Sequence, residues 1–173
     1  MVKFGNIFGS KKDVFDKVAI GEKDLAERKV LAKNTSALEI LNQLANDKDF
    51  EIRREVAHNR NTPAEILEKL SGDDKWEVRY EVARNHNTSN KIMEKLCADK
   101  EWRVREGVAW NEKAPVGVLE RLALDRREVR YAVLMNKHVS IELVKHIELE
   151  NEREEAERRK TETGEPKWMR GRK

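Results

Sequence analysis

The chain has 173 residues and a formal net charge of +3; charged residues make up 40% of it and hydrophobic residues 38%. This apolar share is low for a compact globule and suits one elongated domain with a large surface. The weak positive charge does not by itself indicate nucleic-acid binding. The single cysteine, Cys97, excludes a disulfide framework within the chain and favours a reducing compartment, so we expect a cytoplasmic protein. No apolar run is long enough for a transmembrane segment, and no signal-peptide core is present.

Residues 1–26 are expected to form an N-terminal cap. Phe4, Ile7 and Phe8 stand beside lysines, a pattern that could contact a membrane surface. The favoured interpretation is that they cover the open end of the first repeat, because terminal repeats need caps. Residues 14–25 are expected to form a capping helix.

Residues 27–147 repeat with a period of about 26 residues, which is typical of solenoids. Leu44, Leu70, Leu96 and Leu122 each end a similar segment, and each is followed by an Asp, an apolar–Arg pair and a Val-Ala-x-Asn step or a close variant of it. The segments are 27–44, 47–70, 73–96, 99–122 and 125–147. We therefore predict an all-α fold, an α-solenoid that forms a curved superhelix of about five short helical pairs.

The first helix of each unit is expected to begin at a hydroxyl residue or a proline. These positions are Ser36, Thr62-Pro63, Thr88-Ser89, Ala114-Pro115 and Ser140. A hydroxyl suits the N-cap, and proline suits the first helical position. Ser36 with Glu39 and Thr62 with Glu65 have the spacing of a capping box. The Ile, Leu, Val and Met residues that follow share one helical face and are expected to form the core.

The second helix of each unit is expected to begin near an aspartate that acts as its N-cap and to end near an asparagine. The aspartates are Asp47, Asp73, Asp99 and Asp125. The asparagines are Asn34, Asn59, Asn85, Asn111 and Asn136. Since asparagine tolerates the left-handed conformation that stops a helix, these residues are interpreted as turn residues rather than a binding code.

An arginine recurs in the same helix of every unit, at Arg28, Arg53, Arg79, Arg105 and Arg130. Five such arginines could form a phosphate track. Helical geometry, at about 100° per residue, instead places Arg53 between Val56 and Ala57 on the packed face. An arginine there needs a partner, which the aspartates of the same or the adjacent unit supply. We therefore favour an internal Asp–Arg ladder.

Residues 148–173 are expected to form a charged helical extension and a basic tail. Glu154 with Arg158 and Glu155 with Arg159 have the spacing of helical ion pairs, so residues 148–160 are interpreted as a solvated helix. The last eight residues, 166–173, are basic and contain Trp168. They could bind phosphate or an acidic partner surface, and a plain disordered end is equally compatible with them.

The repeat resembles a known family through the pattern D-x-x-x-E-V-R-x-x-V-A-x-N-x-x-T-P-x-x-x-L-x-x-L, carried most clearly by residues 51–53, 56–59 and 62–63. Over residues 27–147 it resembles the leucine-rich repeat variant family, and its Asp…Val-Arg half is similar to HEAT repeats. The resemblance implies a curved, all-helical superhelix in which one helix of each pair is short or 3₁₀. The spacing is slightly longer than in the variant repeat and much shorter than in HEAT repeats. Some relatives carry a Cys-rich iron–sulfur segment, but Cys97 stands alone, so no cluster is carried over.

Positions i, i+4 and i+8 of the second helix form a stripe at the boundary between its packed and exposed faces. In successive units the stripe consists of Leu25/Lys29/Lys33, Phe50/Arg54/His58, Trp76/Tyr80/Arg84, Trp102/Glu106/Trp110 and Arg127/Tyr131/Met135. Trp, Tyr and Arg are typical of protein interfaces, and aromatics beside Arg and Lys also suit nucleic-acid bases beside a phosphate path. The alternative is that Phe50, Trp76 and Trp102 pack between repeats and the rest of the stripe is ordinary surface.

The leading hypothesis is a non-enzymatic scaffold that binds a protein partner. The partner-binding candidates are Phe50, Arg54, His58, Trp76, Tyr80, Arg84, Trp102, Trp110, Arg127 and Tyr131. The alternative is a nucleic-acid binder whose phosphate contacts are Lys29, Lys33, Arg54, Arg84, Arg127 and the basic tail. The histidines have neither metal-ligand spacing nor a partnered nucleophile, and Cys97 is expected to be a small packing residue. We therefore predict no catalytic residue, no metal site and no cofactor.

Overall fold

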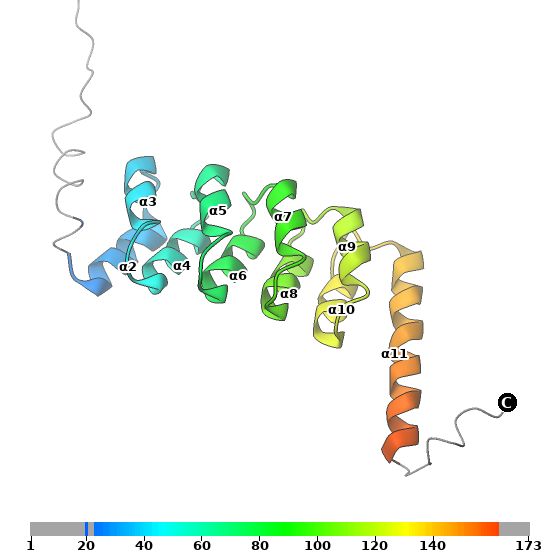
Figure 1. Cartoon of the computed structure of the whole chain (residues 1–173). Helices are drawn as coiled ribbons and strands as arrows, with labels where there is room; N and C mark the ends of the chain where they lie inside the picture. Colours follow the sequence, from blue (N-terminus) through cyan, green and yellow to red (C-terminus); the bar gives the residue numbers. More distant parts are fainter. Residues whose placement is uncertain (1–19, 21–22, 163–173) are drawn as a thin grey trace, which may run out of the picture.

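The computed structural model describes residue 20 and residues 23–162, which form only helices, turns and bends (Figure 1). A first row consists of α2 (Leu25–Asn34), α4 (Phe50–His58), α6 (Trp76–Arg84), α8 (Trp102–Trp110) and α10 (Arg127–Leu134). A second row consists of α3 (Leu38–Leu44), α5 (Ala64–Leu70), α7 (Asn90–Leu96) and α9 (Val116–Leu122), and α11 (Ile141–Glu162) follows. The predicted all-α solenoid of short helical pairs is confirmed. Most of the predicted N-terminal cap and the basic tail lie outside the described residues.

The first row forms the continuous spine of the array. Each of its helices packs directly against the next, from α2 to α10, whereas each second-row helix from α3 to α9 mainly contacts first-row helices (Figure 1). The apolar residues between the two rows are fully buried, for example Ile52 and Val56 of α4 and Leu67 of α5. The predicted core positions of the second row are buried throughout α3, α5, α7 and α9. Burial of this shared core holds the units together, because no unit could bury its apolar face alone.

Helices α3 and α5 begin one residue later than the predicted caps imply, and the predicted capping boxes at Ser36 and Thr62 are wrong. The N-caps of α3 and α5 are Ala37 and Pro63, and neither makes a side-chain cap hydrogen bond. The buried Thr62 hydroxyl instead donates to the Val56 carbonyl oxygen at 2.6 Å. It gives a second donor to this carbonyl at the end of α4, which also accepts from the Asn59 N–H at 3.2 Å. Ser89 does cap α7 by accepting from the Ile92 N–H.

The expected N-cap role of the recurrent aspartates is also wrong, because these residues lie before the N-cap. Asp99 precedes Glu101, the N-cap of α8, and accepts from the Glu101 N–H at 2.9 Å. Asp73 accepts from the N–H of Lys75, the N-cap of α6, at 3.0 Å. Each aspartate therefore accepts a backbone hydrogen bond in the turn that leads into the first-row helix of its own unit. The same carboxylate faces the preceding unit.

An Arg–Asp ladder connects successive units and confirms the internal interpretation of the arginines. Arg79 donates to both oxygens of Asp99 in the next unit, from Nε at 2.7 Å and from Nη2 at 2.8 Å. Its Nη1 donates to the Asp73 carbonyl of its own unit at 2.8 Å. The Arg79 and Asp99 side chains are only 7% and 9% exposed. Equivalent bidentate contacts join Arg53 to Asp73 and Arg105 to Asp125, and an ion pair at 3.0 Å joins Arg28 to Asp47.

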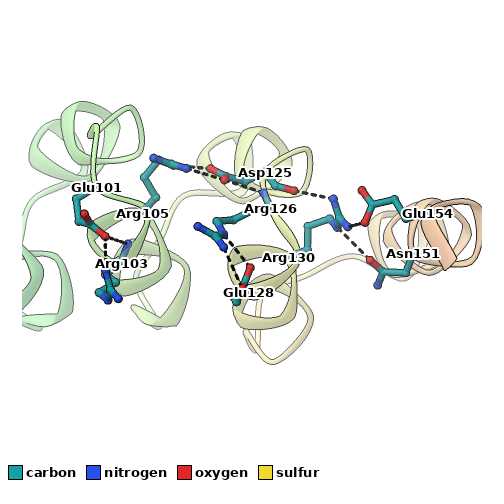
Figure 2. A network of polar contacts seen from close by, with 9 residues as sticks. All are labelled: Glu101, Arg103, Arg105, Asp125, Arg126, Glu128, Arg130, Asn151 and Glu154. Atoms are coloured by element: carbon teal, nitrogen blue, oxygen red, sulfur yellow. Dashed lines mark hydrogen bonds and ion pairs between the residues drawn. The ribbon is translucent and has the colours of Figure 1, made fainter. Parts of the chain in front are cut away.

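Helix α11 supplies the last rung of this ladder, where no further aspartate follows. Arg130 donates to Asn151 Oδ1 at 3.1 Å and pairs with Glu154 (Figure 2). Arg127 of the same helix pairs with Glu155 at 3.0 Å. One face of the extension that the sequence indicated to be simply solvated therefore closes the C-terminal end of the array.

Four of the five recurrent asparagines form a second ladder, and the predicted left-handed conformation is wrong for Asn59, Asn85 and Asn111, which are extended. Asn85, the C-cap of α6, is extended, with φ −69° and ψ 133°. Its side-chain amide donates to the Ala57 and Asn59 carbonyl oxygens of the preceding unit at 2.7 and 3.0 Å. Its Oδ1 accepts from the Asn87 N–H at 2.9 Å, so the turn role holds. The same arrangement recurs at Asn59, Asn111 and Asn136.

Replacing Asn85 by alanine is expected to lower the free energy of unfolding by about 2–4 kcal/mol, because buried carbonyl groups lose their donor. Urea unfolding followed by circular dichroism measures this loss. The matched control is Asn90→Ala, since Asn90 is exposed on α7, and its effect should stay within about 0.5 kcal/mol. Equal effects of the two substitutions would contradict the structural role of the asparagine ladder.

The ladder also predicts acid sensitivity. Burial opposes ionisation of Asp99, but the hydrogen bonds from Arg79 and from the Glu101 N–H outweigh it and lower its pKa below the usual 3.8. A carboxylate with a lowered folded-state pKa stabilises the native state above about pH 4, and this contribution is lost as the pH falls through the folded-state pKa. Urea unfolding should therefore show a constant stability from neutral pH to about pH 5 and a steep decrease below about pH 4.

Replacing Asp99 by asparagine should lower the free energy of unfolding by about 3 kcal/mol at neutral pH and make the decrease in acid shallower. An unchanged dependence of stability on pH would contradict this role of Asp99.

Candidate partner-binding surface

The stripe lies along the first-row helices, beside the buried face. On α4, Ile52 and Val56 are buried, whereas Phe50 and Arg54 are half-buried and His58 is exposed. Because the two ladders hold neighbouring first-row helices in register, stripe residues of successive units come together. The structure thus places the predicted residues on one continuous flank of the array.

The first aromatic of each stripe segment contributes to packing between units as well as to the surface. Phe50, Trp76 and Trp102 are half-buried and pack against the core. The Arg103 guanidinium lies 5.1 Å from the Trp76 ring centroid and 4.6 Å from that of Trp102, and Arg126 covers Trp102 at 4.5 Å. Cation–π attraction of this kind holds the basic side chains over the rings.

The aromatic residues further along the stripe are more open. Trp110 is 37% exposed and Tyr131 is 55% exposed. Their rings make an edge-to-face contact at 6.3 Å between centroids, across the boundary from α8 to α10. Tyr80 is half-buried, and its hydroxyl accepts from Arg84 at 3.0 Å. Trp110 and Tyr131 therefore form an exposed aromatic surface, whereas the Tyr80 ring also packs against the core.

A groove of about 370 Å³ opens along α6 and α8, and we call it the Trp76 groove. It is lined by Arg54, Trp76, Glu77, Tyr80, Glu81, Trp102, Arg103 and Glu106. Gly107 of α8 lets the Tyr80 ring lie close to the helix, since a Cβ there would come within 3.1 Å of the Tyr80 ring. The groove combines aromatic walls with carboxylates, so it can accept a ligand that is both apolar and charged.

Most basic side chains of the stripe are already paired with carboxylates. Lys29 lies 2.6 Å from Glu51, Arg54 lies 2.9 Å from Glu55, and His58 Nδ1 lies 2.9 Å from Glu81. The hydrogen bond that Arg54 donates to the Glu55 carboxylate raises the pKa of Arg54. Arg127 is paired as part of the last rung, and Lys33 is exposed at the end of α2. The stripe is therefore less basic than its sequence indicates.

A second hollow, of about 700 Å³, lies at the C-terminal ends of α4 and α6. It is lined by His58, Arg60, Asn61, Glu81, Arg84, Asn85 and His86. Glu81 lines both hollows, and both follow the stripe, so the stripe and its hollows form one extended surface.

Several residues that shape this surface were not among the predicted site residues, and they include Glu77, Glu81, Arg103, Glu106, Gly107 and Arg126. Each belongs to a position that varies between units; Arg103, for example, stands where Glu51 and Glu77 occur in earlier units. A residue that departs from the repeat was the only sign of these positions in the sequence. The role of such a residue depends on which aromatic ring of the adjacent unit lies beside it, and only the fold shows that ring.

Other side chains provide little reactive chemistry. Cys97 is buried and donates from Sγ to the Glu94 carbonyl oxygen at 3.1 Å, and burial raises the pKa of its thiol. This agrees with a packing role. Across residue 20 and residues 23–162, no group of three or more His, Cys, Asp or Glu side chains is placed to hold a metal ion. None of the helices in this part of the chain is long and apolar enough to cross a membrane.

Comparison with known families supports the repeat. The family model described as leucine rich repeat variant matches residues 50–74, which contain α4, α5 and the turn that follows. The resemblance is confirmed over that unit. Neither the curated proteins nor the solved structures include a match to the chain.

Trp102 and Trp110 are expected to differ in their contribution to stability. Trp102→Ala removes a half-buried ring that packs on the core and binds two guanidinium groups, so it should cost about 3 kcal/mol. Trp110→Ala removes a more exposed ring with one edge-to-face contact and should cost about 1 kcal/mol. Urea unfolding of the two variants measures the difference, and equal losses would show that Trp110 also belongs to the core.

Proposed function

We propose that the protein is a non-enzymatic repeat scaffold that binds a protein partner through the stripe and the Trp76 groove. The observation that carries the proposal is the continuous aromatic flank from Trp76 and Tyr80 to Trp110 and Tyr131, parts of which are exposed although the core does not need them. Exposed Trp and Tyr beside Arg are typical of the energetic centres of protein interfaces. The match to a repeat family supports the scaffold role. The reduced, buried Cys97 fits a reducing compartment such as the cytoplasm.

Nucleic-acid binding is the alternative, and the ion pairs weigh against it. Lys29, Arg54 and Arg127 would have to leave Glu51, Glu55 and Glu155 to contact phosphate. The carboxylates of Glu77, Glu81 and Glu106 line the Trp76 groove and would repel a phosphate path there. A partner that offers apolar and hydrogen-bonding groups meets neither obstacle.

The proposal predicts that partner capture depends on the open aromatics of the stripe. The full chain and a Trp110→Ala/Tyr131→Ala variant would each capture proteins from lysate of the source cells, with quantitative mass spectrometry as the readout. The matched control is Val116→Ala/Leu124→Ala, which removes exposed apolar side chains away from the stripe. Specific partners should be retained by the control and lost by the stripe variant. Identical capture by all forms would overturn the proposed interface.

The nucleic-acid alternative has a direct test. Fluorescence polarisation with labelled single- and double-stranded DNA and RNA should show no tight binding, even at about 50 mM salt. Tight binding that falls by orders of magnitude at about 200 mM salt, and that Arg84→Ala weakens, would instead establish the alternative.

A further inference from the structure

The Trp76 groove contains carboxylates without partners. Glu77 Oε2 is buried and makes no hydrogen bond to the described part of the chain. In the same part of the chain, the side chain of Glu106 in α8 makes neither a hydrogen bond nor an ion pair. An unpaired carboxylate beside apolar surface is costly, because it has lost water without gaining a compensating charge. Although Glu77 Oε2 itself is buried, Glu77 and Glu106 both line the open groove, so a cation that enters the groove could supply the missing charge.

The cations that line the groove do not satisfy these carboxylates. Arg54 pairs with Glu55 at 2.9 Å. Arg103 pairs with Glu101 at 2.8 Å and lies over the rings of Trp76 and Trp102. Glu81, the third carboxylate of the lining, lies 2.9 Å from His58 Nδ1 and also interacts electrostatically with Arg54, so it is not one of the unpaired carboxylates. The charge left uncompensated in the groove is therefore negative.

The walls of the groove suit a cation as well. The rings of Trp76, Trp102 and Tyr80 already bind the guanidinium groups of Arg103 and Arg84. An arginine or lysine side chain places its apolar stem along such rings and its charged end at a carboxylate. A volume of about 370 Å³ is large enough to hold a long side chain and adjacent backbone.

We propose that the Trp76 groove binds an arginine or lysine side chain of a basic peptide segment in the partner protein, with Glu77 and Glu106 as its counter-charges. This inference rests on the proposed function and names the chemistry of the partner. It explains why a stripe rich in arginine directs carboxylates into its groove. It also explains why Glu77 and Glu106 are unpaired while the surrounding arginines are paired.

The test uses the full chain and fluorescence polarisation. The probes are short fluorescein-labelled peptides of glycine and serine that carry arginine, lysine or citrulline, since citrulline keeps the shape of arginine without its charge. The arginine or lysine peptide should bind at least about tenfold more tightly than the citrulline peptide. Glu77→Gln and Glu106→Gln should each weaken that binding about tenfold, and Glu120→Gln, an exposed position on α9, should leave it unchanged.

A structural role for Glu77 gives a different result. Glutamine has nearly the same shape and carries no charge, so Glu77→Gln should keep the melting temperature of the natural chain or raise it. A large loss of melting temperature together with unchanged peptide binding would overturn the proposal. Equal binding of the arginine and citrulline peptides would also overturn the proposal. Self-association of the chain in sedimentation experiments, if the glutamine variants abolish it, would overturn it as well, because the groove would then be occupied by a second copy of the chain.

Failure of this inference can be separated from failure of the proposed function. If the Glu77→Gln/Glu106→Gln chain still captures the partners that the aromatic variant loses, the stripe is the interface and the groove is not a cation site. If neither variant changes capture, the proposed interface is itself wrong.

Discussion

The bidentate contact between an arginine of one unit and an aspartate of the next is the interaction on which the array depends. The arginine lies in the first turn of a first-row helix, as Arg79 does in α6, and its aspartate shapes the turn before the next first-row helix. The asparagine at the other end of the helix donates to carbonyl groups of the preceding unit. Each first-row helix is thus fastened at both ends. Apolar packing supplies most of the stabilisation, but it is not directional, so these contacts set the register between units.

The register explains how the candidate surface is assembled from separate units. Arg103 of α8 can bind the rings of Trp76 and Trp102 together only because α6 and α8 keep a fixed offset. Tyr80 lies against Gly107 for the same reason. Substitutions in either ladder should therefore disturb the groove without touching its lining. Function and fold remain separable, because the ladder residues face the interior and the open aromatics of the stripe do not.

The repeat, the core positions and the Arg–Asp ladder were predictable, because they follow from periodicity and from the need to pair a buried charge. The asparagine ladder was not, since a helix-ending asparagine also fits a left-handed turn, and its true partners are carbonyl groups of another unit. The spacing of the aspartates predicts N-caps, because sequence spacing alone does not distinguish the N-cap residue from a residue in the turn that precedes it. The charge of the groove was missed for a related reason. Counting arginines along the stripe indicates a basic surface, and only the structure shows that Arg54 and Arg103 are paired while Glu77 is not.

The central claim is that the side-chain ladder couples neighbouring units, and a double-mutant cycle on Arg79 and Asp99 tests it most directly. Urea unfolding of Arg79→Ala, Asp99→Ala and the double variant yields the coupling free energy between the two side chains. The account predicts a favourable coupling of about 1.5–3 kcal/mol, with each single variant strongly destabilised by the unpaired charge that remains. Additive effects, within about 0.5 kcal/mol, would show that the contact does not hold the units together and would contradict the account.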